Sequence, residues 1–135
     1  MQKIEWTEGF SVGVSKFDEQ HKQLIGIFNQ LVENLSDTPD GELANKILAD
    51  MTVYAWTHFQ EEERLMEEHL YPDYAEHKEQ HLAYQKKVES LCIACLHLEG
   101  DLPDQLISFL RNWWMNHILE EDMKYKAFFE EKGLQ

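Results

Sequence analysis

Apolar residues recur along this chain at steps of three and four, the spacing that places side chains on one face of an α-helix. Four such stretches predict helices over residues 18–35, 42–69, 74–98 and 104–131. Short segments rich in Gly, Pro and Asp separate them. Because long helices with short connections lie antiparallel to their neighbours, the predicted fold class is all-α, an up-down-up-down antiparallel four-helix bundle.

The start of the chain lacks this periodicity. Gly9 and Gly13 interrupt any regular helix there, and aromatic residues such as Trp6 offer anchors. We therefore expect residues 1–15 to form an extended N-terminal arm. The length suits one domain covering residues 1–135, large enough to bury a core without disulfides.

Histidine occurs on the apolar stripe of every predicted helix. A single histidine among core residues is more often a hydrogen-bonded structural residue than a ligand. In an antiparallel bundle, however, the starts of the first and third helices meet the later parts of the second and fourth. Burying several imidazoles there without a common partner would cost roughly several kcal/mol, so we expect a metal centre. The histidines in this layer are His21, His58, His77, His81 and His117.

Carboxylates accompany two of these histidines. Glu62 follows His58 by four residues and lies about 40° from it on one helical face, although chance alone gives about one such pair in so acidic a chain. Its acidic neighbours are expected on a solvated face. After His117 the geometry is ambiguous, because Glu121 is four residues on, whereas Asp122 is five on and about 140° away. Spacing favours Glu121, and Asp122 would need a local bulge.

These residues carry a resemblance to a known family. In type, order and spacing they resemble the hemerythrin family, specifically its bacterial single-domain members. The run from Trp6 to His21 is similar to that family's start, and the match spans essentially the whole chain. The positions that match the family's ligand pattern are His21, His58, Glu62, His77, His81, His117 and Asp122.

The resemblance implies a hemerythrin-like domain with a non-haem di-iron centre, two iron ions joined by an oxo or hydroxo group. It therefore selects Asp122 over Glu121. One iron would be coordinatively full, and the other would keep an open position for dioxygen or a small anion. The implied arrangement is a full iron on His77, His81 and His117, an open iron on His21 and His58, and bridging carboxylates Glu62 and Asp122.

The function implied by the resemblance is reversible oxygen binding for transport, storage or delivery, rather than an enzyme activity. The ligand chemistry agrees, because five neutral imidazoles and two carboxylates place less negative charge on the metals than glutamate-rich ferritin-like sites do. That should disfavour high-valent iron and favour binding and release. The alternatives are a di-iron oxidase or peroxidase, removal of nitric oxide or peroxide, and iron buffering.

Two tryptophans precede His117 by four and three residues, and both side chains can lean over the metal layer. Ordinary core packing is favoured for Trp113. Trp114 departs from the family, which usually has a leucine there lining the oxygen pocket, so this ring could narrow that pocket. The predicted inward stripe of this helix is Leu106, Leu110, Trp113, His117, Lys124 and Phe128.

Charge and composition exclude several partners. Twenty-six acidic against twelve basic residues give a net charge of -14, which argues against nucleic acid or an anionic membrane surface. The sequence does not open with a signal-peptide pattern, and no apolar run reaches about 18 residues. We therefore expect neither secretion nor membrane insertion, and we expect a cytoplasmic location. Cys92 and Cys95 are expected to pack as small hydrophobic residues.

Overall fold

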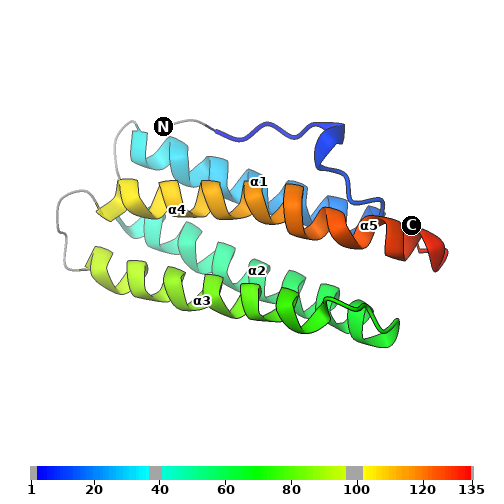
Figure 1. Cartoon of the computed structure of the whole chain (residues 1–135). Coiled ribbons are helices and arrows are strands. Elements are labelled where there is room, and N and C mark those ends of the chain that lie inside the picture. The colour runs from blue at the N-terminus through cyan, green and yellow to red at the C-terminus, as the bar shows by residue number, and fades with distance from the viewer. Residues whose placement is uncertain (1–2, 37–40, 97–101, 135) are drawn as a thin grey trace.

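Four helical rods that alternate in direction make up the molecule (Figure 1). The computed structural model describes residues 3–36, 41–96 and 102–134, with side chains for 3–34, 43–91 and 104–134. The predicted all-α four-helix bundle is therefore confirmed. Its elements are α1 (Ser15–Ser36), α2 (Gly41–Glu68), α3 (Tyr74–Leu96) and a fourth rod built from α4 (Leu102–Asn116), the π-helical turn η2 (His117–Asp122) and α5 (Met123–Glu131).

The helix limits lie within a few residues of the sequence expectation, and two features differ. The arm contains a short 3-10 helix, η1 (Glu8–Phe10), and is not extended throughout. The last predicted helix is interrupted by η2 instead of running straight from 104 to 131. The predicted end of the third helix, and the side chains of Cys92 and Cys95, lie outside the described residues.

The N-terminal arm runs back along α1 and is fixed to it by hydrogen bonds (Figure 1). The Asn29 side chain accepts from the Ile4 backbone N–H at 2.9 Å and donates to the Ile4 carbonyl oxygen at 2.8 Å. Asp18, in the first turn of α1, accepts from the Val12 N–H at 2.8 Å. Gly13 has a φ of +79°, which only glycine adopts readily, so the chain can turn sharply into α1.

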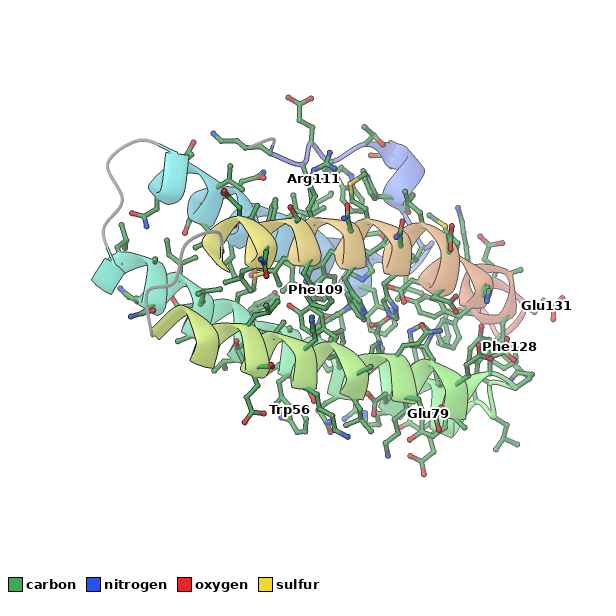
Figure 2. All side chains as sticks on the ribbon, turned by 60° about the vertical axis from the view of Figure 1, so that its left-hand side comes forward. Trp56, Glu79, Phe109, Arg111, Phe128 and Glu131 are labelled. Atoms are coloured by element: carbon green, nitrogen blue, oxygen red, sulfur yellow. The ribbon has the colours of Figure 1, made fainter. Side chains whose placement is uncertain are left out.

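The interior between the rods is filled by apolar side chains, while side chains such as those of Trp56 and Glu79 project outward (Figure 2). The fourth rod changes register within this core. Lys124, predicted to face inward, is exposed, and Phe128 is only partly buried. Tyr125 and Phe129 are buried instead, at 0% exposure each. The cause is η2, because a π-helical turn holds one residue more than an α-helical turn and shifts every later side chain by one position.

The turn from α2 to α3 contains a strained residue. Leu70 has a φ of 57°, the left-handed conformation, and its side chain is 83% exposed. The Tyr71 N–H donates to the Met66 carbonyl oxygen at 2.9 Å, the hydrogen bond that closes a Schellman motif. This motif normally has glycine where Leu70 stands, because a Cβ is crowded in that conformation.

Replacing Leu70 with glycine should therefore stabilise the protein. Relief of the Cβ clash should raise the free energy of unfolding by about 1 kcal/mol, since the exposed side chain contributes little burial. Urea unfolding measures the change. Leu70→Ala keeps the Cβ and serves as the control, and an equal gain in both variants would refute the strain argument.

Within the described residues, no helix is both long and apolar enough to span a lipid bilayer.

Candidate metal centre

Seven polar side chains meet in one buried layer of the bundle core. α1, α2 and α3 each contribute to this layer, and the fourth rod contributes from η2. Their relative exposures range from 0% to 4%, values found for polar groups only when they are paired or bind a ligand. Antiparallel packing aligns the residues as the sequence predicted. The members are His21, His58, Glu62, His77, His81, His117 and Asp122.

One half of the layer is formed by α1 and α2. The Nε2 atoms of His21 and His58 lie 2.9 Å apart. The His58 Nε2 atom is 2.8 Å from Oε1 of Glu62, the carboxylate one turn further along α2. The His21 Nε2 atom is 3.1 Å from Oδ2 of Asp122. Two imidazole nitrogens and two carboxylates thus point at a common space.

The other half is formed by α3 and the start of η2. The Nε2 atoms of His81 and His117 lie 3.1 Å apart, and that of His77 is 2.9 Å from Oδ1 of Asp122. The same Oδ1 atom is 3.0 Å from Nε2 of His117. Glu62 reaches this half less closely, with Oε1 at 3.8 Å from Nε2 of His81. Three imidazole nitrogens therefore surround a second space.

The two halves overlap through the carboxylates. One group of potential ligands contains three histidines with Glu62, and the other contains two histidines with Glu62 and Asp122; within each group the ligand atoms lie within 4.8 Å of one another. Glu62 belongs to both groups. The two oxygens of Asp122 face different histidine sets, which is the placement expected of a carboxylate that bridges two ions.

The turn η2 decides which acid after His117 enters this layer. The Met123 N–H donates to the carbonyl oxygen of Ile118, five residues back, and this wider turn carries Asp122 inward to 0% exposure. Glu121 instead points to the surface, where its carboxylate lies 3.1 Å from Nζ of Lys124. The choice of Glu121 from α-helical spacing is wrong, because that spacing assumes an uninterrupted α-helix.

The donor set fits a metal centre. Buried atoms directed into the layer face one another at close range but form no hydrogen bond within the described structure, among them Glu62 Oε1, His77 Nε2 and both Asp122 carboxylate oxygens. An unpaired buried polar atom costs about 1–3 kcal/mol, so several together call for a ligand that engages them all. Imidazole and carboxylate donors suit divalent iron, manganese and zinc.

Three polar side chains outside the layer hold the inner residues in place. The Tyr125 hydroxyl donates to Oε2 of Glu62 at 2.6 Å. Outer nitrogens of two histidines also have partners, since His58 Nδ1 lies 2.5 Å from the Gln20 amide oxygen and His81 Nδ1 lies 2.8 Å from Oε2 of Glu63. Hydrogen bonds of this kind orient ligands and tune their basicity. Helical periodicity alone missed Tyr125, because η2 shifts the register.

Aromatic rings close the layer on the side facing the middle of the bundle. Phe59 stacks on His81 at 3.8 Å between ring centroids, and Trp113 stacks on His117 at 4.2 Å. Trp114 lies beside the two-histidine half, with its ring centroid 6.3 Å from that of His58. Its indole N–H donates to the Tyr84 hydroxyl at 3.0 Å. Trp113 is thus partly buried core, as expected, but it also supports a histidine of the layer.

Electrostatics in the layer are dominated by burial and by close pairs of imidazole and carboxylate. Burial and the charge of Asp122 push the pKa of Glu62 upward, but the facing imidazoles of His58 and His77 outweigh both and hold it at about 2. Burial also opposes ionisation of Asp122, yet His117 keeps its pKa well below the ordinary value. Burial lowers the pKa of His77, and the adjacent Asp122 carboxylate more than reverses that and raises it.

These shifts predict that Glu62 and His77 together contribute most to the stability of the metal-free protein between about pH 4.5 and 6.5. As pH falls below 4.5, unfolded Glu62 binds a proton that the folded state accepts only near pH 2, which removes about 3 kcal/mol of stability. As pH rises through the raised pKa of folded His77, the stability from its protonated form is lost. Urea unfolding of chelator-treated protein at several pH values tests this. The stability advantage of the wild-type protein over His77→Gln should shrink as pH rises above 6.5, and an advantage that stays constant to pH 8 would contradict the prediction.

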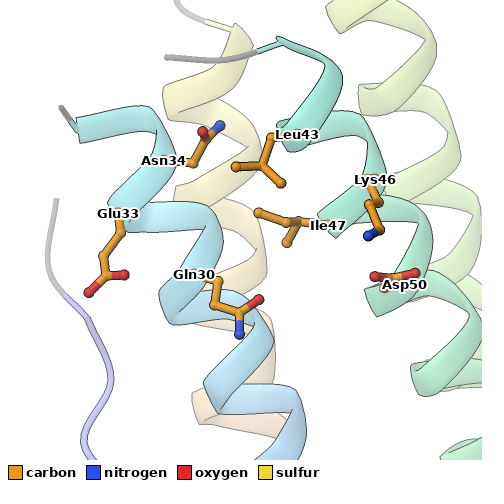
Figure 3. Close-up of a pocket in the computed structure, with 7 residues that line it drawn as sticks. All are labelled: Gln30, Glu33, Asn34, Leu43, Lys46, Ile47 and Asp50. Atoms are coloured by element: carbon orange, nitrogen blue, oxygen red, sulfur yellow. The ribbon is translucent and has the colours of Figure 1, made fainter. Parts of the chain in front are cut away.

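The described structure also has two surface pockets, and neither offers a set of metal ligands like that of the buried layer. The pocket in Figure 3 lies between the later part of α1 and the start of α2, and none of its lining residues belongs to the layer. It is lined by Gln30, Glu33, Asn34, Leu43, Lys46, Ile47 and Asp50. A second groove, between α2 and α3, does reach the layer, because His81 and Glu63 form part of its lining.

Comparison with known proteins identifies the arrangement. The model of the hemerythrin HHE cation binding domain matches residues 12–129 of this chain. The chain belongs to the hemerythrin family. The resemblance noted from the seven residues is thereby confirmed. A bacteriohemerythrin of Stenotrophomonas maltophilia is 31% identical over 126 residues, covering 93% of this chain and 80% of that protein.

Other hemerythrin relatives match over similar lengths. A bacteriohemerythrin of Clostridium acetobutylicum is 31% identical, covering 89% of this chain and 96% of its own. Myohemerythrin of Riftia pachyptila is 29% identical, covering 90% of both chains. A crystal structure of wild-type hemerythrin superposes with a TM-score of 0.76 at 25% identity, covering 93% of this chain and 97% of that chain. The shared fold thus extends over nearly the whole bundle.

Proposed function

We propose that this hemerythrin-family chain, acting as one domain, binds dioxygen reversibly at a di-iron centre and serves to carry, store or deliver it. The observation that carries the proposal is the convergence of five imidazoles and two carboxylates into two groups that share Glu62. In this assignment Glu62 and Asp122 would bridge the two ions. His77, His81 and His117 hold one iron, and His21 and His58 hold the other.

The unequal number of histidines supports binding of an outside ligand at one ion. An ion held by His21 and His58 would have one histidine donor fewer than its neighbour, which would leave room for dioxygen or a small anion. A di-iron pair held here would supply the two electrons that reversible oxygen binding requires. The surrounding residues exclude water, because the layer is buried and aromatic rings cover it.

The balance of charge supports a carrier over an oxidising enzyme. Five neutral imidazoles against two carboxylates leave the two ions with substantial positive charge, which disfavours high-valent iron. The Tyr125 hydroxyl donates to Glu62 and occupies one of its oxygens, and burial with the nearby charges of Asp122 and Glu62 raises the pKa of Tyr125 well above its ordinary value. This tyrosine therefore remains a hydrogen-bond donor at physiological pH.

Trp114 is expected to restrict entry of ligands to the two-histidine half. It is 3% exposed, packs beside His58 and stacks on Phe59 with ring centroids 5.5 Å apart. Trp114→Leu should speed binding of azide to the ferric protein roughly tenfold, which corresponds to a barrier lower by about 1.4 kcal/mol. Stopped-flow absorbance measures the rate. Trp113→Leu, on the three-histidine side, is the matched control, and unchanged kinetics in Trp114→Leu would show that this ring does not guard the entry route.

The proposed function is tested by metal analysis and visible spectroscopy on the purified protein. We expect two irons per chain, a charge-transfer spectrum when oxygen is admitted to the reduced protein, and loss of that spectrum when oxygen is removed. Steady oxidation of an organic substrate by oxygen, or steady removal of nitric oxide or peroxide, would instead favour a di-iron enzyme. Rapid loss of iron to a weak chelator would favour iron buffering. A cytoplasmic location stays a prediction from the sequence.

A further inference from the structure

The two halves of the metal layer have outer hydrogen-bond partners of different charge. In the two-histidine half, His58 Nδ1 donates to the neutral amide oxygen of Gln20 at 2.5 Å. In the three-histidine half, His81 Nδ1 donates to a carboxylate oxygen of Glu63 at 2.8 Å. Because the partner of a ligating imidazole sets its basicity, this difference acts unequally on the two metal ions.

The Gln20 side of this arrangement is electrically balanced. Its amide nitrogen donates to a carboxylate oxygen of Glu61, which fixes the amide orientation and leaves the oxygen to accept from His58. The other oxygen of Glu61 lies 3.1 Å from Nζ of Lys16. The charge of Glu61 is thus offset by a lysine, and the group that touches His58 is itself uncharged.

The Glu63 side keeps a net negative charge next to its histidine. Its side chain is only 12% exposed, so water screens the carboxylate weakly. In the part of the chain that the structure describes, the ion-pair partner of Glu63 is His81, and no lysine or arginine lies within ion-pairing distance of it. Glu63 and His81 both line the groove between α2 and α3.

We propose that Glu63 and Gln20 are positioning residues that give the two metal ions unequal reduction potentials. This inference rests on the proposed di-iron function. A carboxylate that accepts from His81 makes that imidazole a stronger donor and stabilises the higher charge of a ferric ion in the three-histidine half. The neutral amide of Gln20 gives His58 less donor strength, so the ion of the two-histidine half holds its electron more tightly. If an electrode withdrew one electron from a reduced centre held here, the three-histidine ion would therefore become ferric first, and the ion of the two-histidine half would stay ferrous.

The test compares isosteric variants of the iron-loaded protein by spectroelectrochemistry, with Mössbauer spectra of the half-oxidised samples. Glu63→Gln keeps an oxygen for His81 but removes the charge. At a fixed potential we expect the ferrous-to-ferric ratio of the three-histidine ion to rise about tenfold, equivalent to 59 mV for one electron. Glu67→Gln is the matched control, because it removes an equal charge from the same groove without contacting a histidine of the layer. A ratio changed less than about twofold is expected there.

A second variant moves charge without changing the total. Gln20→Glu combined with Glu61→Gln places the carboxylate against His58, and we expect the ferric state to become favoured in the two-histidine half. Equal shifts in Glu63→Gln and Glu67→Gln, or no shift in Glu63→Gln and in the double variant, would overturn the inference. A wild-type protein that holds two irons but fails to bind oxygen reversibly would refute the proposed function alone, since the potentials remain measurable.

Discussion

Replacing Asp122 with alanine should remove both iron ions from the protein. The two oxygens of Asp122 face opposite halves of the layer, with Oδ2 at 3.1 Å from His21 and Oδ1 at 2.9 Å from His77. If Asp122 bridges two ions as proposed, its loss therefore deprives both of a donor. Because mutating even an outer partner of a metal ligand costs about 10–100-fold in affinity, we expect a loss of at least about 100-fold here.

Glu121→Ala is the matched control for this prediction. It removes a carboxylate of the neighbouring residue, which pairs with Lys124 at the surface and not with the layer. Iron content per chain, measured after gel filtration, should fall below half an ion in Asp122→Ala and stay near two in Glu121→Ala. The reverse result would mean that η2 relaxes to an α-helix when metal binds. Equal retention of iron in both variants would show that neither acid bridges.

Much of this site followed from the sequence because helical periodicity and antiparallel order are both simple rules. His21, His58 and His77 lie at different positions along their helices, yet the alternating direction of the rods brings them into one layer. That reasoning needs only the number of residues from each helix end and the short connections. It therefore predicted the fold and the histidine cluster without knowledge of side-chain contacts.

What the sequence could not show depends on departures from ideal helices and on partial burial. The π-helical turn η2 places Asp122 inward and Glu121 outward, whereas a regular α-helical turn would do the reverse. The local residue pattern does not predict this π-helical turn. The same choice exposes Lys124 and buries Tyr125. Only the likeness to hemerythrins selected the acid that enters the layer, because the family pattern already contains the effect of the turn.

The acidic run on α2 shows a second limit of sequence reasoning. The neighbours of Glu62 were expected to face solvent. Instead, Glu61 accepts a hydrogen bond from the Gln20 amide, and Glu63 accepts one from His81 Nδ1. Both are half-buried, so their roles depend on which side chains of α1 and α3 lie opposite. Three consecutive glutamates thus have three different partners. Residue type and spacing along one helix cannot distinguish such roles.

Removing the metal should destabilise the fold more than any single surface substitution. Four of the buried atoms that point into the layer, Glu62 Oε1, His77 Nε2 and the two Asp122 oxygens, form no hydrogen bond within the described structure. At about 1–3 kcal/mol each, loss of metal should lower the free energy of unfolding by about 5 kcal/mol at neutral pH, because binding free energy adds to folding free energy. For a domain of this size that corresponds to a fall in Tm of about 15–20 °C, measured by calorimetry before and after chelation.

Adding ferrous iron back without oxygen should restore the Tm. Asp122→Ala, which we expect to hold little metal, should show a much smaller response to the chelator, and an unchanged Tm in the wild-type protein would mean that the layer is stable without ions.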